Sequence, residues 1–381
     1  MLVLHTSDTH LGKRQYNLDF REEDVYQTFR SIIDIAIKER VKLIVHSGDF
    51  YDVNNPSNKA ELIAYTELKR IKEKGIQLVV IPGDHDSPKR STDVYPLYLL
   101  RELDLIRLIL NPLTDYYSFK FDGDEICVHG SKHYPYVSAE KLKEALKQLK
   151  PLCKKSILLL HQGYKELLPY QYSWQIQLGD LPKGFRYYAL GHLHTRRVIR
   201  NSDGSLIGIA GSPEIFREEE IEGYKKDGKG VFLLDFSKDD EVSLQKIDLE
   251  IRRQEVEKIL VNDLNKEIER IINKYKNSEK KKPILHLILE GEVAKREVIE
   301  KELRKLYQIA EYYRIYKDNT KIKIGTQRLE IPEKSTIDDL IVDFLKKNGL
   351  NQSEAELVLR IINSESEEET VRLLKLFSGL E

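Results

Sequence analysis

The sequence predicts an α/β protein in which two packed β-sheets are covered by helices, followed by a smaller α/β domain and a helical C-terminal segment. Three observations support this fold class. Over residues 1–245, apolar strand-like runs alternate with amphipathic helical runs, which is typical of a largely parallel, buried sheet. A second, shorter set of alternating elements follows over residues 246–316. After a linker-like stretch without helical periodicity (317–334), residues 335–381 contain only amphipathic helical runs.

The first five elements predict a βαβαβ unit. Apolar, β-branched runs at residues 2–8, 41–50 and 76–84 are typical of buried strands. Between them, residues 21–40 and 58–75 repeat apolar side chains at the spacing of an amphipathic helix. Because strands separated by helices pair in parallel, we expect these three strands to lie in one sheet.

Later segments complete the two predicted sheets and the smaller domain. Further strands are expected at residues 125–131, 156–163, 186–194, 205–212 and 230–236, with a helix over residues 138–150. The smaller domain is predicted to contain a helix, a basic loop, a strand, a second helix and a second strand, at residues 253–275, 276–283, 284–291, 295–307 and 312–316. The C-terminal segment is expected to open with a helix capped by Ser335.

Composition and charge limit the class of protein. Apolar residues make up 40% of the chain, and no stretch approaches the ~18 consecutive apolar residues of a membrane span. The N-terminus becomes polar and acidic within a few residues, unlike a signal peptide. Cys127 and Cys153 are too few for a disulfide framework, which favours a reducing cytoplasm. We therefore expect a cytoplasmic protein that does not associate with membranes.

The near-zero net charge of −1 hides an uneven distribution. Residues 246–330 carry 21 Lys and Arg against 16 Asp and Glu, whereas residues 331–381 carry 6 against 11. Such asymmetry suggests that the two regions have separate tasks. The lysine-rich loop at residues 276–283 is either simply solvated or in contact with nucleic-acid phosphates.

Acidic and imidazole side chains recur where predicted strands end. They are Asp8, His10, Asp49, Asp84, His85, His161, His192 and His194. Ligands gather at the carboxyl ends of strands in open α/β sheets, so these side chains can converge. Histidine and carboxylate ligands together suit manganese, iron or zinc. These side chains are also more numerous than a single metal ion needs. A pair of ions can clamp a phosphate during displacement, and a histidine next to them can protonate the leaving oxygen.

The motifs that carry these residues resemble a known family. "DTHLG", "SGDFYD", "PGDHD", "LLLHQG" and "ALGHLH" are similar to the five motifs of the calcineurin-like metallophosphoesterases. The "DTHLG" opening and the "HQG" before "GHLH" resemble the SbcD or meiotic-recombination-eleven branch, a family of DNA nucleases. The resemblance covers the whole chain and implies a four-layer α-β-β-α sandwich with a capping domain and a C-terminal helical segment.

The resemblance also implies a role for each strand-end residue. Asp8, His10 and His194 would hold one metal ion, and Asp84, His161 and His192 would hold the second. Asp49 would bridge the two ions, and His85 would protonate the leaving group. The implied cofactors are two manganese ions, with magnesium or iron as alternatives.

The implied substrates and partners follow from the same family. The substrate would be DNA, cut at double-stranded ends, hairpins and single strands during double-strand-break repair. The partner would be a coiled-coil ABC ATPase of the SbcC or Rad-fifty type, bound through residues 335–381. The chain would form a homodimer through residues 58–74 and 94–103.

Residue 84 departs from the family pattern, in which the motif reads "GNHD". An asparagine would offer a neutral oxygen, whereas Asp84 offers a full negative charge. We expect Asp84 still to bind metal, but more tightly, and to repel the incoming phosphate. Two alternatives to an active nuclease therefore stay open: a phosphoesterase for small molecules or phosphoproteins, and a weakly active DNA-tethering scaffold.

Other polar residues near these motifs have simpler expected roles. A single histidine is more often a hydrogen-bonded structural residue than a ligand, and we expect this of His5, His46 and His286. His129 and His133 are either structural or in contact with substrate. Asp86 is expected to support its loop or to orient a ligand from behind.

Overall fold

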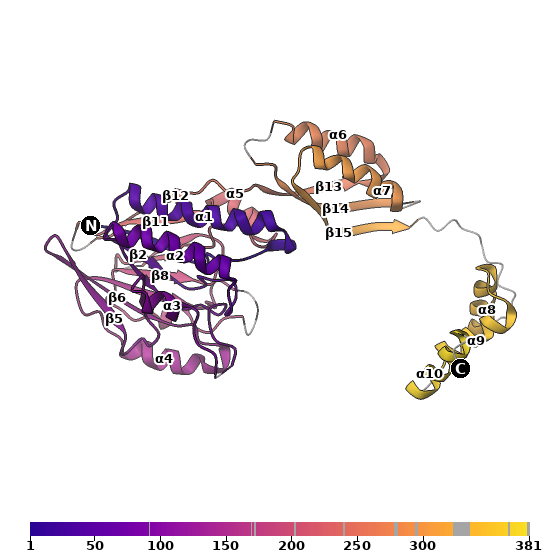
Figure 1. The fold of residues 1–381 in the computed structure, drawn as a ribbon, viewed down its shortest axis with the longest axis horizontal. Helices are drawn as coiled ribbons and strands as arrows, with labels where there is room; N and C mark the ends of the chain where they lie inside the picture. Colours follow the sequence, from indigo (N-terminus) through magenta and orange to yellow (C-terminus); the bar gives the residue numbers. More distant parts are fainter. Residues whose placement is uncertain are drawn as a thin grey trace. The chain divides into compact units, whose positions relative to one another are not determined.

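A computed structural model describes most of the chain (Figure 1). The described residues are 1–90, 92–168, 170, 173–201, 203–238, 241–277, 281–293, 296–322, 336–364 and 366–378. They fall into two compact units, residues 1–321 and residues 322–381, which are described separately.

The first sheet of the larger unit contains the predicted βαβαβ unit. Its strand order is β12-β11-β1-β2-β3-β4. The strands are β1 (Leu2–Thr6), β2 (Leu43–His46), β3 (Gln77–Val80), β4 (Arg107–Leu108), β11 (Gly230–Asp235) and β12 (Ser243–Asp248). Strands β1 to β4 pair in parallel, as predicted for the first three, and β11 and β12 are antiparallel additions.

The second sheet has the same size and a similar plan. Its strand order is β5-β6-β7-β8-β10-β9, and β6, β7, β8 and β10 run parallel. The strands are β5 (Tyr116–Phe121), β6 (Asp124–Ser131), β7 (Lys155–His161), β8 (Tyr187–Gly191), β9 (Arg197–Arg200) and β10 (Leu206–Ile209). Both sheets therefore present the carboxyl ends of three or more neighbouring parallel strands.

The two sheets pack face to face, with helices outside. Val45 and Val79 of the first sheet share one buried cluster with Val128 and Leu159 of the second. The outer face of the first sheet packs against helices α1 (Asp19–Lys38) and α2 (Asn58–Glu73), and that of the second sheet against α4 (Ala139–Gln148). In Figure 1, α1 and α4 lie on opposite sides of the two sheets. The predicted four-layer fold is confirmed.

A small α/β domain follows the sandwich. Its sheet, in the order β13-β14-β15, is covered on one face by the two helices α6 and α7 (Figure 1). The elements are β13 (Gln254–Leu260), α6 (Leu264–Tyr275), β14 (Ile284–Val293), α7 (Arg296–Leu303) and β15 (Tyr312–Ile322).

The helix predicted over residues 253–275 is wrong in its first part. Residues 254–260 form β13, which pairs in parallel with β14, and only residues 264–275 are helical. The run contains residues that favour helices, but pairing with the apolar strand β14 overrides this local preference. Glu257 is buried on β13 because Tyr275 and Lys274 of α6 each bind its carboxylate at 2.6 Å.

Two predicted boundaries also differ from the structure. Strand β12 continues to Asp248, past the boundary predicted at residue 245, because its partner β11 extends its pairing that far. Strand β15 continues to Ile322, past residue 316, so part of the predicted linker is strand. The rest of that linker lies outside the described residues, as does Ser335. The first C-terminal helix is instead capped by Thr336, whose hydroxyl accepts the Asp339 backbone N–H.

Buried ion pairs join the small domain to the sandwich. Asp24 of α1 accepts Arg252 at 2.6 Å and Arg21 at 2.8 Å. Lys281 of the basic loop adds a third contact to Asp24, at 3.2 Å. At least one lysine of the loop considered for DNA contact therefore has an internal partner; residues 278–280 of that loop lie outside the described residues.

The two cysteines form a disulfide, contrary to expectation. Cys127 on β6 is joined to Cys153, which lies just before β7. The parallel pairing of β6 with β7 brings the two residues together across a separation of 26 residues. The argument from cysteine content to a reducing compartment thus loses its basis. Among the described residues, no helix is long and apolar enough to cross a membrane.

The described part of the second unit contains three short helices. They are α8 (Ile337–Lys347), α9 (Gln352–Ile362) and α10 (Glu367–Ser378). Their described side chains include several exposed large apolar residues: Ile337, Phe344, Ile362, Val371, Leu374, Leu376 and Phe377.

Candidate metal centre

The predicted site residues converge at the carboxyl ends of strands from both sheets. Asp8 and His10 follow β1, Asp49 follows β2, and Asp84 and His85 follow β3. From the second sheet, His161 ends β7, while His192 and His194 follow β8. All eight predicted residues meet here because the two sets of parallel strands end at adjoining edges.

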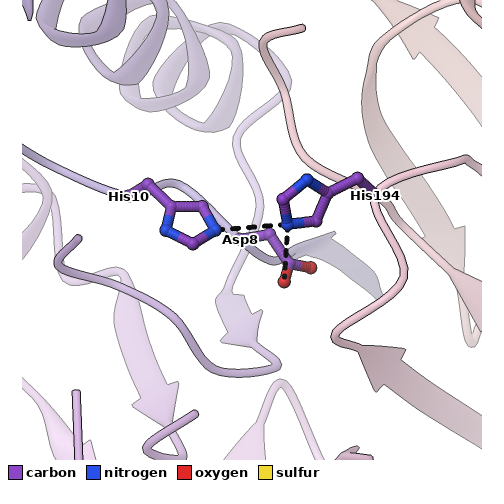
Figure 2. A group of neighbouring side chains, drawn as sticks. All are labelled: Asp8, His10 and His194. Atoms are coloured by element: carbon purple, nitrogen blue, oxygen red, sulfur yellow. Dashed lines mark hydrogen bonds and ion pairs between the residues drawn. The ribbon is translucent and has the colours of Figure 1, made fainter. Parts of the chain in front are cut away.

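Asp8, His10 and His194 form the first cluster, with ligand atoms within 4.8 Å of one another (Figure 2). The Nε2 atoms of His10 and His194 face each other at 3.3 Å, and Asp8 Oδ1 lies 3.9 Å from His194 Nε2. Asp8 Oδ2 is buried and has no hydrogen-bond partner. An unsatisfied carboxylate oxygen next to two converging imidazole nitrogens fits a bound cation.

Asp84, His161 and His192 form the second cluster. Asp84 Oδ1 lies 3.2 Å from His161 Nε2 and 3.3 Å from His192 Nδ1. Two imidazoles and one carboxylate are a donor set that manganese, iron and zinc accept.

Asp49 lies between the two clusters. Its Oδ2 atom is 3.6 Å from His10 Nε2 and 3.4 Å from His161 Nε2. The backbone N–H of His85 donates to its other oxygen, at 2.9 Å. Asp49 is therefore fixed so that one oxygen faces a residue of each cluster.

The charges in this centre are strongly coupled. Burial opposes ionisation of Asp49, but the nearby His161 and His10 imidazoles hold its pKa well below the usual range. Burial would lower the pKa of His161, but Asp49 and Asp84 raise it well above its usual value. In the protein without metal, a proton on His161 thus balances the carboxylates. Divalent cations would supply the same balance, and the donor set fits them.

The backbone at the centre adopts an uncommon conformation. Asp8, His10, Asp49 and His192 have φ values of 50°, 44°, 54° and 77°. Such left-handed conformations are unfavourable for residues other than glycine and cluster at functional sites. Hydrogen bonds from the backbone N–H of Asp8 to Gly48 and of His10 to Asp49, at 2.9 and 3.0 Å, stabilise these turns.

His85 is placed at the rim of the centre. Its Nδ1–H donates to the carbonyl oxygen of Asp52 at 2.6 Å, and its side chain is 36% exposed. The His85 and His10 rings lie 4.7 Å apart, centroid to centroid. His85 is thus next to the clusters and partly exposed.

Asp86 supports the loops that carry Asp49 and Asp84. Its buried carboxylate accepts the backbone N–H groups of Phe50 at 2.8 Å, Tyr51 at 2.7 Å and Gly83 at 3.3 Å. Burial and the neighbouring Asp49 raise the pKa of Asp86 to about 7. These three hydrogen bonds join the ends of β2 and β3 and so set the distance between Asp49 and Asp84.

Two other histidines are hydrogen-bonded within the core. His5 contacts Tyr187 Oη at 2.8 Å and Ser47 Oγ at 2.7 Å, and His46 Nε2 contacts Thr9 Oγ1 at 2.9 Å. Burial lowers the pKa of each to about 3, which keeps both imidazoles neutral.

Comparison with known proteins agrees with this geometry. The calcineurin-like phosphoesterase family matches residues 1–202. The DNA double-strand break repair protein Mre11 of Sulfurisphaera tokodaii is 53% identical and aligns over 97% of this chain and 95% of its own. The proteins of the same name from Sulfolobus acidocaldarius and Saccharolobus solfataricus are 48% and 47% identical, covering 100% and 99% of both chains.

The chain belongs to the Mre11 branch of the calcineurin-like phosphoesterases. It is therefore a metal-dependent hydrolase, and its clusters of histidine and carboxylate side chains have the donor atoms that divalent metal ions require. The resemblance inferred from the five strand-end motifs is confirmed.

Two residues of this Mre11-type centre, which lie behind His194, were not predicted from the sequence. Glu220 contacts His194 Nδ1 at 2.8 Å, and Lys229 contacts Glu220 at 2.5 Å. Neither residue lies at the end of a predicted strand or in one of the five motifs. The only available signal was an acidic run, "REEE", after "GSPEIF", which resembles an ordinary solvated helix start.

A substitution at Gly83 would test whether metal binding depends on the close contact between Gly83 and Asp49. A Cβ atom at residue 83 would overlap the Asp49 carboxylate and its backbone N–H, so Gly83→Ala must displace Asp49. We expect manganese affinity, measured by calorimetry, to fall by about 10-fold or more. Gly179→Ala is the control, because a Cβ there meets nothing within 4 Å. Unchanged manganese affinity in Gly83→Ala would show that Asp49 does not depend on this close approach.

Proposed function

We propose that this chain is a two-metal, manganese-dependent nuclease that hydrolyses DNA phosphodiester bonds during double-strand-break repair inside the cell. The observation that carries the proposal is the buried centre in which Asp49 faces both a His10-containing and a His161-containing cluster. The relatives named DNA double-strand break repair proteins support the choice of DNA as substrate.

In this proposal each cluster holds one ion. Asp8, His10 and His194 bind the first, and Asp84, His161 and His192 bind the second, with Asp49 shared. Two such ions supply positive charge for the phosphate and activate the attacking water. The protein's contribution is a fixed ligand geometry, which the left-handed turns at Asp8 and Asp49 and the Asp86 hydrogen bonds maintain.

His85 is proposed to protonate the leaving oxygen. The Asp52 carbonyl fixes the ring through Nδ1–H, which directs Nε2 toward a substrate. The Asp52 carboxylate also lies close to this ring, with Oδ1 3.7 Å from Nδ1. Burial opposes ionisation of Asp52, but His10 and Lys13 lower its pKa to about 2, so this carboxylate is charged at neutral pH.

We expect His85→Ala to lose about 100-fold or more of manganese-dependent DNA cleavage, the usual contribution of a general acid. Metal content and DNA binding should stay at wild-type levels, because His85 is outside both proposed ligand sets. Cleavage would be measured on double-stranded ends and hairpins, with a small aryl phosphodiester in parallel. Retained DNA cleavage in the His85→Ala variant would show that His85 does not protonate the leaving oxygen.

The same assays on the wild-type protein separate the alternative functions. Hydrolysis of the aryl ester alone would indicate a small-molecule phosphoesterase, and DNA binding without hydrolysis would indicate a tethering scaffold.

We expect the negative charge of Asp84 to lower the rate of DNA cleavage and to strengthen metal binding. Asp84→Asn keeps an oxygen ligand but removes a negative charge, which leaves the centre more attractive to phosphate. We expect faster cleavage at saturating manganese and manganese affinity weaker by about 10-fold, since affinity depends on ligand charge. Cleavage assays and calorimetry would measure the two effects. Equal or lower activity in Asp84→Asn would mean that the carboxylate is a ligand to which this centre is adapted.

Two assemblies belong to the same proposal. A homodimer is proposed through α2 and residues 94–103, where Leu62, Val94 and Leu99 are 62%, 67% and 49% exposed. A coiled-coil ABC ATPase of the SbcC or Rad-fifty type is proposed to bind the apolar side chains of α8 to α10. The three helices leave Phe344, Ile362 and Leu376 exposed, which is typical of a partner-binding surface.

Charged substitutions separate these two assemblies. Leu62→Glu with Leu99→Glu should convert a sedimenting dimer to a monomer, because the new charges would be buried in the interface. Phe344→Glu with Leu376→Glu should abolish co-purification with the ATPase from the same source and leave the dimer intact. A wild-type monomer in dilute solution, or ATPase binding that survives the tail substitutions, would contradict the respective assembly.

A further inference from the structure

A buried ion pair lies behind His194, on the side away from the ligand clusters. Glu220 and Lys229 contact each other at 2.5 Å, and their side chains are 6% and 1% exposed. Burying two charges costs free energy unless every donor and acceptor is used. The partners of this pair therefore indicate what it does.

Glu220 uses both carboxylate oxygens. Oε1 accepts His194 Nδ1–H at 2.8 Å and the Arg217 backbone N–H at 3.1 Å. Oε2 accepts Lys229 Nζ at 2.5 Å and Ser212 Oγ at 3.1 Å. Burial opposes ionisation, but Lys229 and His194 hold the pKa of Glu220 well below its usual range, so the carboxylate is charged.

Lys229 secures His194 at two points. Its Nζ donates to the His194 carbonyl oxygen at 2.8 Å and to Ser212 Oγ at 2.7 Å, in addition to Glu220. The three donors of the ammonium group are thus all used. Through the carbonyl, Lys229 fixes the backbone of His194, and through Glu220 it fixes the ring.

The consequence is a defined tautomer of His194. With Nδ1–H donating to Glu220, Nε2 carries the lone pair of the ring, and Figure 2 shows this nitrogen facing Asp8 and His10. His10 is arranged in the same way, since its Nδ1 contacts the Asp52 carboxylate at 3.2 Å. His161 differs, because its Nδ1 contacts the neutral Ser47 carbonyl at 2.7 Å. Both imidazoles of the first cluster are therefore backed by carboxylates.

We propose that Glu220, held by Lys229, is a positioning residue that fixes His194 in its Nδ1–H tautomer and so sets the affinity of the Asp8–His10–His194 cluster for its divalent cation. The inference rests on the proposed two-metal function. A carboxylate behind a ligating imidazole fixes the ring and raises its basicity, and losing such a partner usually weakens metal binding 10–100-fold.

The test is Glu220→Gln, which keeps the side-chain shape but removes the anionic acceptor. Manganese binding by the full chain would be measured by calorimetry. We expect one of two binding steps to weaken by about 10–100-fold and the other to stay within about 2-fold. In the metal-free protein, nitrogen-15 NMR of the His194 ring should show a larger share of the Nε2–H tautomer.

Glu214→Gln is the matched control. Glu214 is also a buried carboxylate, in the segment just before helix α5 (Glu220–Asp227), and it accepts Arg21 at 3.0 Å and Thr28 Oγ1 at 2.7 Å. It contacts no imidazole in the described hydrogen bonds. The substitution should lower thermal stability and leave manganese affinity and the His194 tautomer unchanged.

A double variant separates positioning from stability. Glu220→Gln alone leaves the buried Lys229 without its counter-ion, which costs stability, whereas Glu220→Gln with Lys229→Met removes both members of the ion pair. If Glu220 only stabilises the fold, the double variant recovers stability and metal affinity together. Under the proposal, stability recovers and metal affinity stays weak.

The outcomes distinguish this inference from the proposed function. Wild-type protein that binds fewer than two manganese ions would overturn the two-metal proposal. Wild-type protein that binds two ions, with a folded Glu220→Gln variant that binds both equally well and keeps the same tautomer, would overturn the role of Glu220.

Discussion

The structure depends on one constraint: carboxylates and imidazoles are buried where two sheets meet. Asp8 is fully buried, and Asp49 and His161 nearly or fully so. Buried charges are tolerated only when they are paired or bind metal. The parallel strands supply the arrangement, because their carboxyl ends place these residues on turns from both sheets. The apolar cluster between the sheets keeps the two edges adjoining and thereby determines the distances between ligands.

The surrounding shell of this centre consists largely of backbone and carboxylate contacts. Asp86 binds three backbone N–H groups, Ser47 offers a carbonyl to His161, and Asp52 and Glu220 back His10 and His194. The two clusters consequently differ in charge. Each cluster has one carboxylate among its ligand atoms, Asp8 or Asp84, but the first cluster also has the carboxylates of Asp52 and Glu220 behind its imidazoles. A negative charge behind an imidazole makes that imidazole a stronger metal ligand. A negative charge among the ligand atoms themselves repels an approaching phosphate.

The sequence predicted those features that depend on local pattern. Strand-end motifs located the eight residues whose side chains meet at the two clusters, because a polar group after a buried strand has few alternative explanations. Local sequence pattern did not predict the features that depend on contacts between residues far apart in the sequence. Residues 254–260 favour helix locally but pair with β14, and Cys127 meets Cys153 only because β6 and β7 are neighbours. Glu220 and Lys229 were missed for the same reason: their partner His194 is distant in sequence, and they lie in no recognisable motif.

The segment after β10 shows how the centre and the small domain are connected. Along it, Glu214 binds the buried Arg21, which also contacts Asp24 at the joint with the small domain. Glu218 accepts Arg314 of β15 at 2.9 Å, and two residues later Glu220 binds His194. One short stretch of backbone therefore contacts both the small domain and a residue of the metal centre. Different side chains make these contacts, Glu214 and Glu218 on one side and Glu220 at His194, so a change at Glu214 can weaken the joint without removing the carboxylate behind the imidazole.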